Sequence, residues 1–357
     1  MHAVLLQGHG GHDQLEYRTD VPVPVPGPSD VLISVGAAGI NNTDINTRIG
    51  WYSKLVTTGT TSEGASGYSD DVSDDGDWAG EGLSFPRIQG ADVAGTIVAV
   101  GATVDTSRIG ERVIVRTMQT AYAVDDPTAC VTLGSELDGG FAQFCKVDAQ
   151  EAFTIKSSLT DTELASFPCA YSTAEGVLHR AGVVAGERVL ITGASGGVGS
   201  AAIQLAKRRG AIVVAVASQA KWPDLEVLGA DELLDRDADL VAALGTESVD
   251  AVVDVVAGPA WPALLEVLRK QGRYVTCGAI AGPIVELDVR TLYLKDLTLI
   301  GCTYQPRIVM ENLVGYIERG EIQPLVAGTF PLAEMRRAQQ RFMEKQHVGA
   351  FVIDMSS

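Results

Sequence analysis

A glycine-rich turn between an apolar stretch and an amphipathic stretch marks residues whose spacing suits phosphate binding. Residues 189–209 read VLITGASGGVGSAAIQLAKRR, with Gly193, Gly196 and Gly199 in the turn. The apolar residues after the turn fall on one face of a helix: Val198, Ala201, Ala202, Leu205 and Ala206. A turn of this kind lets a pyrophosphate approach backbone N–H groups at the positive end of a helix. The sequence therefore predicts a dinucleotide site here.

The next predicted strand, AIVVAVA, shows which dinucleotide is favoured. It ends at Ala217 and is followed by Ser218, Gln219, Ala220 and Lys221. Sites specific for NAD place an acidic residue here to accept from the ribose 2′-OH. Ser218 and Lys221 can instead hydrogen-bond and neutralise a 2′-phosphate. We therefore predict NADP(H) as the cofactor; the alternative is that Lys221 is a solvated lysine at a helix start.

A parallel sheet would position these residues. From about Leu164, strand-like segments alternate with helical ones: 189–192, 212–217, 251–256, 274–278 and 297–302. This alternation predicts an α/β domain with a parallel, doubly wound sheet. Ligands of such sheets bind at the carboxyl ends of the strands. Val255, Gly278 and Ile280 follow two of these strands and are predicted to contact the cofactor.

The residues before this sheet predict a different architecture. Short strands bounded by glycine or charged turns suggest a small β-barrel; they are expected at 31–40, 94–100, 112–116 and 141–147. The last residues predict helices at 307–320 and 332–345 and a strand at 350–353, which return to the first domain. The expected domains are 1–155 (catalytic), 156–305 (cofactor-binding) and 306–357 (the return).

An acidic insert, residues 53–84, interrupts the first domain. It is rich in Gly, Ser, Thr and Asp and poor in apolar residues. A segment of this composition and length is either a lid or channel wall, or an inert solvated insert. Both interpretations stay open.

Charge and composition exclude several classes of protein. The net charge is −18 over 357 residues, which argues against nucleic-acid and anionic-membrane partners. No apolar run is long enough to span a bilayer, and MHAVLLQ lacks a basic leader, so a cytoplasmic location is expected. The five cysteines are scattered without a CxxC, which favours neither disulfides nor a four-cysteine zinc site.

Several motifs together resemble the medium-chain dehydrogenase/reductase superfamily over nearly the full length. They are GAAGINNTD (36–44), FPRIQGADVAGTIVAVG (85–101), DGGFAQF (138–144), CAYSTAEG (169–176), the glycine-rich turn and GRYVTCGAIAG (272–282). The resemblance implies a GroES-like β-barrel catalytic domain plus a Rossmann domain. It also implies a homo-oligomer, a dimer or tetramer, formed by pairing the edges of Rossmann sheets.

The resemblance also bears on zinc. Zinc-dependent alcohol dehydrogenases of this superfamily carry metal ligands at the positions of Asn41, Ala91 and Cys169. Only Cys169 still offers a thiol, whereas catalytic zinc needs three protein ligands. Cys169 is most simply a small buried residue, and no metal is expected.

The chain is thus similar to the zinc-independent branch, which contains quinone oxidoreductases and enone or enoyl reductases. The resemblance implies hydride transfer from NADPH to a conjugated carbonyl or quinone, a small-molecule substrate. DINTRIGWY (44–52) resembles the segment of mitochondrial-type enoyl reductases that ends in their catalytic tyrosine, which maps onto Tyr52. Tyr52 is then a proton donor or hydrogen-bond donor; alternatively it only packs in the site.

The resemblance assigns further contacts. Asn41 and Thr173 would lie at the nicotinamide, unless they only hold tight turns. In the GASGGVG form of the turn, the pyrophosphate would accept from the backbone N–H groups of Gly196, Gly197 and Val198, with the Ser195 hydroxyl beside them.

Two other functions stay open. One is an alcohol or carbonyl dehydrogenase, either zinc-free or with a distorted metal site that uses Cys169 and Asp92. The other is a non-catalytic, crystallin-like nucleotide-binding protein, for which RNA binding is disfavoured by the acidic charge.

Overall fold

The computed structural model describes residues 1–60, 66–68, 82–122 and 131–356. Most of the acidic insert therefore lies outside the described residues. Contacts divide the chain into two compact units. The first unit comprises residues 1–56, 63–169 and 310–357, and the second comprises 57–62 and 170–309. The boundary thus falls inside helix α3 (Pro168–Arg180) instead of at the predicted residue 155, because residues 156–169 pack with the first unit.

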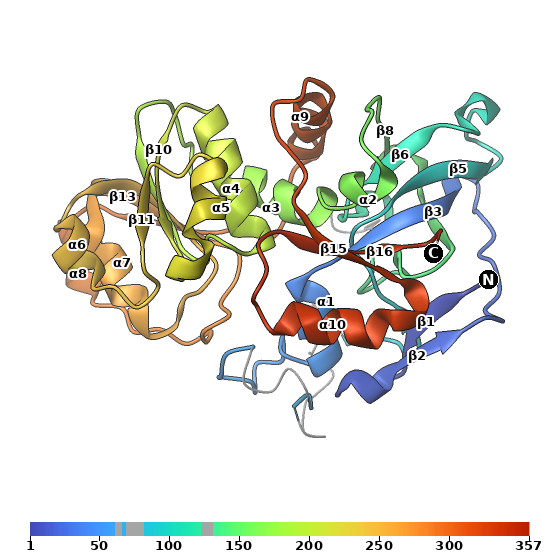
Figure 1. Ribbon diagram of the computed structural model, residues 1–357, viewed down its shortest axis with the longest axis horizontal. Coiled ribbons are helices and arrows are strands. Elements are labelled where there is room, and N and C mark those ends of the chain that lie inside the picture. Colours follow the sequence, from blue (N-terminus) through green and yellow to red (C-terminus); the bar gives the residue numbers. More distant parts are fainter. Residues whose placement is uncertain (61–65, 69–81, 123–130, 357) are drawn as a thin grey trace. The chain divides into compact units, whose positions relative to one another are not determined.

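The first unit is built from β-strands (Figure 1). One sheet has the order β15-β16-β3-β5-β6-β8, with β7 paired to β3, and a second has the order β2-β1-β4. The strands are β1 (Ala3–Leu6), β2 (Leu15–Arg18), β3 (Asp30–Ile40), β4 (Arg87–Ile88), β5 (Ala94–Val100), β6 (Arg112–Val115), β7 (Phe144–Asp148), β8 (Ala152–Thr154), β15 (Val326–Pro331) and β16 (Ala350–Asp354).

The C-terminal strand returns to the first unit, as predicted. β16 pairs antiparallel with β3, so that Phe351 lies opposite Ile40. The helices of this unit are α1 (Asn42–Ile49), α2 (Asp161–Leu164), α10 (Met335–Met343) and most of α9 (Arg307–Glu318), whose residues 307–309 belong to the second unit. Ile33, Ile97, Phe141 and Phe342 belong to its apolar core. β3 is the long central strand of this core, and it delivers Asn41 at its end.

The second unit contains the predicted doubly wound parallel sheet, in the order β11-β10-β9-β12-β13-β14. Its strands are β9 (Arg188–Ile191), β10 (Ile212–Val216), β11 (Glu232–Leu234), β12 (Val249–Asp254), β13 (Leu268–Thr276) and β14 (Thr298–Gly301). Strand β11 was missed in the sequence because only two apolar residues stand between acidic ones. The predicted fold class, two domains of mixed α/β structure with one parallel sheet, is confirmed.

Helices cover both faces of this sheet (Figure 1). α4 (Gly197–Arg208) and α5 (Trp222–Val227) lie on one side, and α6 (Leu240–Leu244), α7 (Trp261–Val267) and α8 (Val289–Leu294) lie on the other. Leu190 and Val252 of the sheet and Leu264 of α7 belong to one buried apolar cluster. Within the described residues, no helix combines the length and apolar character needed to cross a membrane.

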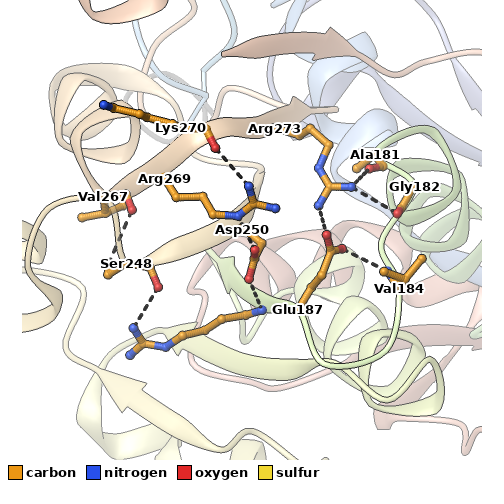
Figure 2. A network of polar contacts seen from close by, with 11 residues as sticks. Ala181, Gly182, Val184, Glu187, Ser248, Asp250, Val267, Arg269, Lys270 and Arg273 are labelled. Atoms are coloured by element: carbon orange, nitrogen blue, oxygen red, sulfur yellow. Dashed lines mark hydrogen bonds and ion pairs between the residues drawn. The ribbon is translucent and has the colours of Figure 1, made fainter. Parts of the chain in front are cut away.

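Ion pairs hold the amino ends of three central strands together (Figure 2). Asp250 of β12 accepts from the Arg188 backbone N–H at 2.7 Å and from the Arg269 guanidinium. Arg273 of β13 pairs with Glu187, which directly precedes β9, and donates to the Ala181 carbonyl at 2.8 Å. This edge lies opposite the predicted cofactor residues, which follow the carboxyl ends of the same strands. We therefore interpret the network as structural.

Candidate active site

The glycine-rich turn of the second unit has the geometry of a phosphate-binding turn. Gly193 has a φ of +56°, which favours glycine, and Gly196 is the N-cap of α4. A Cβ on Gly199 would lie 2.4 Å from the Gly193 carbonyl oxygen, so glycine is required there. The first N–H groups of a helix have no partner inside it. Gly197 and Val198 occupy the first positions of α4, which fits a bound pyrophosphate.

Two of the predicted cofactor residues meet beside this turn. Lys221 Nζ donates to Ser195 Oγ at 3.2 Å, and Ser218 is the N-cap of the short helix that ends at Lys221. Burial lowers the pKa of Lys221, and the nearby Arg236 lowers it further. Arg236 follows β11, so the sequence analysis, which missed that strand, did not identify it. Two cations near the end of β10 are chemically suited to a 2′-phosphate.

The loops after β12 and β13, which carry Val255, Gly278 and Ile280, lie side by side. The Ile280 backbone N–H donates to the Val255 carbonyl at 3.4 Å, and a Cβ on Gly278 would lie 3.2 Å from the same oxygen. Asp254, which is buried at the end of β12, accepts from the Val256 backbone N–H at 2.9 Å and from the Tyr274 hydroxyl at 2.6 Å. It holds the loop in place, and sequence reasoning did not identify it.

Thr173 has a buried partner that the sequence did not reveal. Gln305, which is 4% exposed, donates from Nε2 to Thr173 Oγ1 at 3.0 Å. Thr173 lies on α3, and Gln305 follows β14. In this contact the Thr173 hydroxyl oxygen is the acceptor. Its own hydrogen is not used in the contact and can be donated to another group.

In the first unit, Asn41 lies in a cluster of buried polar groups. Asn41 is the N-cap of α1, and its backbone N–H donates to Asp44 Oδ2 at 2.7 Å. Its side-chain Nδ2 donates to Asp92 Oδ2 at 2.6 Å. The other oxygen of Asp92 accepts from the Cys169 backbone N–H at 2.5 Å. The sequence analysis named Asp92 only as a possible metal ligand, and the hydrogen bond to Asn41 is new.

Burial changes the ionisation of both carboxyl groups. Burial, with a smaller contribution from the charge of Asp92, raises the pKa of Asp44 to about 7. It also raises the pKa of Asp92 to about 7, although hydrogen bonds from Asn41 and Cys169 favour the carboxylate. In both groups, burial favours the neutral carboxylic acid, and the hydrogen bonds from N–H donors favour the charged carboxylate.

Tyr52 lies in the same part of the first unit. Its hydroxyl donates to Thr43 Oγ1 at 3.3 Å, and the Asn46 side chain is a second hydrogen-bond partner. Burial raises the pKa of Tyr52 to about 12, with smaller contributions from the nearby Cys169 and Asp44. At neutral pH the phenol is therefore protonated and able to donate a hydrogen bond.

The predicted site residues thus fall into two groups. Asn41 and Tyr52 lie in the first unit, around Asp44 and Cys169. The other predicted residues lie in the second unit, at the carboxyl edge of its sheet: Thr173, Ser195, Gly196, Gly197, Val198, Ser218, Lys221, Val255, Gly278 and Ile280.

The side chains at the expected zinc positions do not fit a catalytic zinc ion. The Asn41 amide is hydrogen-bonded to Asp92, Ala91 has no donor atom, and only Cys169 has a thiol. Among the described residues, no group of three or more His, Cys, Asp or Glu side chains is arranged to hold a metal ion. A zinc ion with an open position needs three ligands that these side chains do not supply.

Comparison with family models matches both parts of the chain. The model described as "Alcohol dehydrogenase GroES-like domain" matches residues 27–157, and the model described as "Zinc-binding dehydrogenase" matches residues 197–319. The predicted GroES-like and Rossmann-like domains are thereby confirmed.

Individual proteins resemble the chain over nearly its full length. A solved structure of a candidate alcohol dehydrogenase from Sinorhizobium meliloti 1021 is 45% identical, with a TM-score of 0.88 over 99% of this chain and 96% of that one. The acryloyl-coenzyme A reductase of Sulfurisphaera tokodaii is 27% identical, with 99% of both chains covered. The human quinone oxidoreductase is 26% identical over 96% of this chain and 94% of its own length.

Proposed function

Because the chain belongs to the medium-chain dehydrogenase/reductase superfamily, a family of oxidoreductases that bind NAD(P)(H), we propose that it is an NADPH-dependent, zinc-independent reductase. Its substrate is an α,β-unsaturated carbonyl compound or a quinone. The observation that carries this proposal is the hydrogen bond between Asn41 and Asp92, at a position where zinc-dependent members bind metal.

The donors of the first unit suit a conjugated substrate. When bound, NADPH supplies a hydride, and reduction of an enone or quinone places negative charge on the substrate oxygen. Hydrogen-bond donors stabilise such an anion, whereas the alkoxide of a saturated alcohol depends on a Lewis acid. Asn41 would donate from its amide and Tyr52 from its protonated hydroxyl, whose single hydrogen would turn from Thr43 to the substrate. Because its pKa is about 12, Tyr52 is a weak acid and serves first as a hydrogen-bond donor.

The preference for NADPH is supported by charge. Lys221 and the nearby Arg236 provide two cations close to the end of β10, where NAD-specific sites carry an acidic residue. The bond from Lys221 to Ser195 places this ammonium beside the phosphate-binding turn. A 2′-phosphate would accept from both Lys221 and Ser218.

A second candidate function is alcohol or carbonyl dehydrogenation, since the 45% identical protein is a candidate alcohol dehydrogenase. The purified protein should be assayed for NADPH oxidation with 2-enones, quinones, enoyl thioesters and aldehydes. Alcohols should be tested with NADP⁺. Turnover of enones or quinones supports the proposal. Turnover of alcohols and saturated aldehydes alone would contradict it.

Oligomerisation and cytoplasmic location remain part of the proposal. Exposed apolar side chains gather near α8 and β14: Ile284, Leu287, Val289, Tyr293, Leu294 and Leu299. Among the described strands, β14 ends the sheet and pairs with β13 alone. An apolar surface beside an open strand edge suits a second copy of the chain. Light scattering of the purified protein should therefore give a dimer or tetramer.

A further inference from the structure

Three segments of the first unit meet at the Asp92 carboxylate. The first segment follows β3 and carries Asn41, the second precedes β5 and carries Asp92, and the third is the start of α3, whose second residue is Cys169. Asp92 is 1% exposed. Its two oxygens accept from Asn41 Nδ2 at 2.6 Å and from the Cys169 backbone N–H at 2.5 Å. A Cβ on Gly39 would lie 2.5 Å from Asp92 Oδ2, so the glycine makes room for this carboxylate.

The same segments carry the three positions that hold zinc in metal-dependent members: Asn41, Ala91 and Cys169. In this chain they are joined by a carboxylate and two N–H donors. In metal-dependent members, a zinc ion would connect the segment after β3 with the start of α3. In this chain, hydrogen bonds to Asp92 make that connection instead. That connection also determines how the Asn41 side chain is oriented.

An asparagine amide has an acceptor end and a donor end of similar size. Only Nδ2 can face a carboxylate oxygen, because Oδ1 in that position would be repelled. Asp92 therefore fixes which end of the Asn41 amide faces it. Nδ2 carries two hydrogens, and one of them is donated to Asp92. The other remains a donor.

We propose that Asp92 is a positioning residue, which holds the Asn41 amide so that its second Nδ2 hydrogen is presented to the oxygen of the substrate. The inference deepens the proposed function and rests on it, because it requires a substrate that becomes negatively charged at oxygen. Asp92 itself touches neither substrate nor cofactor.

Asp44 provides a matched comparison. It is also buried, and its carboxylate accepts from the backbone N–H groups of Asn41 at 2.7 Å and Gly90 at 3.2 Å. In the described part of the chain, no hydrogen bond joins its carboxylate to the Asn41 side-chain amide. Its backbone N–H, at the third position of α1, faces the Asn41 side chain in a capping box, and Asp44→Asn leaves that N–H in place. Removal of its charge should weaken the turn without affecting the direction of that amide.

Asp92→Asn tests the proposal with little change of shape. The new side chain has one carbonyl oxygen, which can keep the contact with the Cys169 N–H. Its amide nitrogen then faces Asn41, whose own amide must turn over and present Oδ1. We expect kcat with a 2-enone to fall by about tenfold to a thousandfold, the effect of losing one oxyanion donor. The KM for NADPH should change less than about twofold, since no cofactor contact is lost. Asp44→Asn should retain kcat within about threefold.

The double variant Asn41→Asp/Asp92→Asn separates positioning from folding. It restores an amide-to-carboxylate hydrogen bond with its direction reversed. The melting temperature and NADPH binding, followed by fluorescence, should then match the wild type. The kcat should stay low, because the group nearest the substrate is now an acceptor. Recovery of kcat in this double variant would overturn the proposal, since any link between the two segments would then suffice.

A measurement without turnover distinguishes this inference from the proposed function. In protein labelled with ¹⁵N at asparagine side chains, the hydrogen that Asn41 donates to a carboxylate should resonate downfield of ordinary amide protons. Asp92→Asn should abolish that signal, and Asp44→Asn should retain it. A signal unchanged in Asp92→Asn overturns the positioning role. Absence of enone or quinone turnover in the wild type would instead overturn the proposed function, whatever the spectrum shows.

Discussion

Lys221 Nζ donates to Ser195 Oγ at 3.2 Å, and this bond joins the glycine-rich turn after β9 to the turn after β10. The two strands are parallel neighbours, with Ala215 opposite Ile191. Their following loops therefore emerge at the same edge of the sheet. On the proposed function, the Lys221 ammonium group would lie beside the 2′-phosphate, the group that distinguishes NADP from NAD.

Replacement of Lys221 by alanine should raise the KM for NADPH by about tenfold to a hundredfold, the cost of one charge-assisted hydrogen bond. The KM for NADH should change far less, because NADH has no 2′-phosphate. Steady-state kinetics with both cofactors would measure this. Ser195→Ala is the control, since it removes the hydroxyl next to Lys221 and keeps the charge. Equal effects of Lys221→Ala on both cofactors would show that Lys221 does not bind the 2′-phosphate.

Replacement of Tyr52 by phenylalanine removes a single hydroxyl from the first unit. If Tyr52 donates to the substrate, turnover of a 2-enone should fall by about tenfold to a thousandfold. The KM for NADPH should remain close to that of the wild type. Trp51→Phe is a suitable control, because Trp51 packs edge-on against Tyr52 with ring centroids 5.6 Å apart. Unchanged turnover in Tyr52→Phe would leave Tyr52 with a packing role only.

Metal content provides an independent test of the zinc-free mechanism. The purified protein should contain far less than one zinc ion per chain, and a chelator should leave its rate unchanged. Ala91 offers no donor atom and the Asn41 amide is held by Asp92, so the three ligands that catalytic zinc needs are not available. Atomic absorption and assays after dialysis would measure both. Cys169→Ser should likewise retain activity. Stoichiometric zinc whose removal abolishes activity would favour the alcohol dehydrogenase alternative.

Local features of the chain were predicted well from the sequence. The glycine-rich turn, the strands around it and the residues at their carboxyl ends follow from short-range patterns, and the structure adds that Val255 lies next to Ile280. The family models confirm the two domains. Strand β11 was missed, and Arg236 was missed with it.

Contacts between distant residues could not be predicted in this way. Asn41 and Asp92 are 51 residues apart, and Thr173 and Gln305 are 132 apart. Neither Asp92 nor Gln305 stands in a periodic pattern that indicates its partner. A buried carboxylate becomes informative only when the fold shows which donors surround it.

The two buried carboxyl groups predict how stability depends on pH. Burial raises the folded-state pKa of Asp44 and Asp92 to about 7, whereas an aspartate in an unfolded chain has a pKa of about 4. The folded state therefore binds more protons between these values. The stabilisation from protonation is fully present below about pH 4 and is lost as the pH rises through about 7.

Asp92→Asn should therefore gain stability relative to the wild type as the pH is raised from 4 to 8. Denaturant unfolding at a series of pH values would give the difference in free energy. Asp44, Cys169 and Tyr52 are the other titratable groups near Asp92, and they are unchanged in this variant. A difference that is constant across this range would contradict the assignment of a raised pKa to Asp92.

The buried pair of Arg116 and Glu151 predicts a large loss of stability on substitution. Arg116 Nη1 lies 3.0 Å from both carboxylate oxygens, and the two side chains are 2% and 3% exposed. Glu151→Gln leaves the guanidinium buried without its counter-charge. The free energy of unfolding should fall by about 3–5 kcal/mol, measured by denaturant unfolding.

An exposed pair provides the control for that measurement. Arg337 and Glu334 lie 2.8 Å apart with side chains that are 68% and 42% exposed. Glu334→Gln should change the free energy of unfolding by less than about 1 kcal/mol, because water and salt screen the pair. Replacement of both buried partners by apolar residues of similar size should recover much of the loss, since no lone charge remains. If Glu151→Gln cost no more than Glu334→Gln, the guanidinium of Arg116 would have to be satisfied by its other contacts, and the ion pair would contribute little to stability.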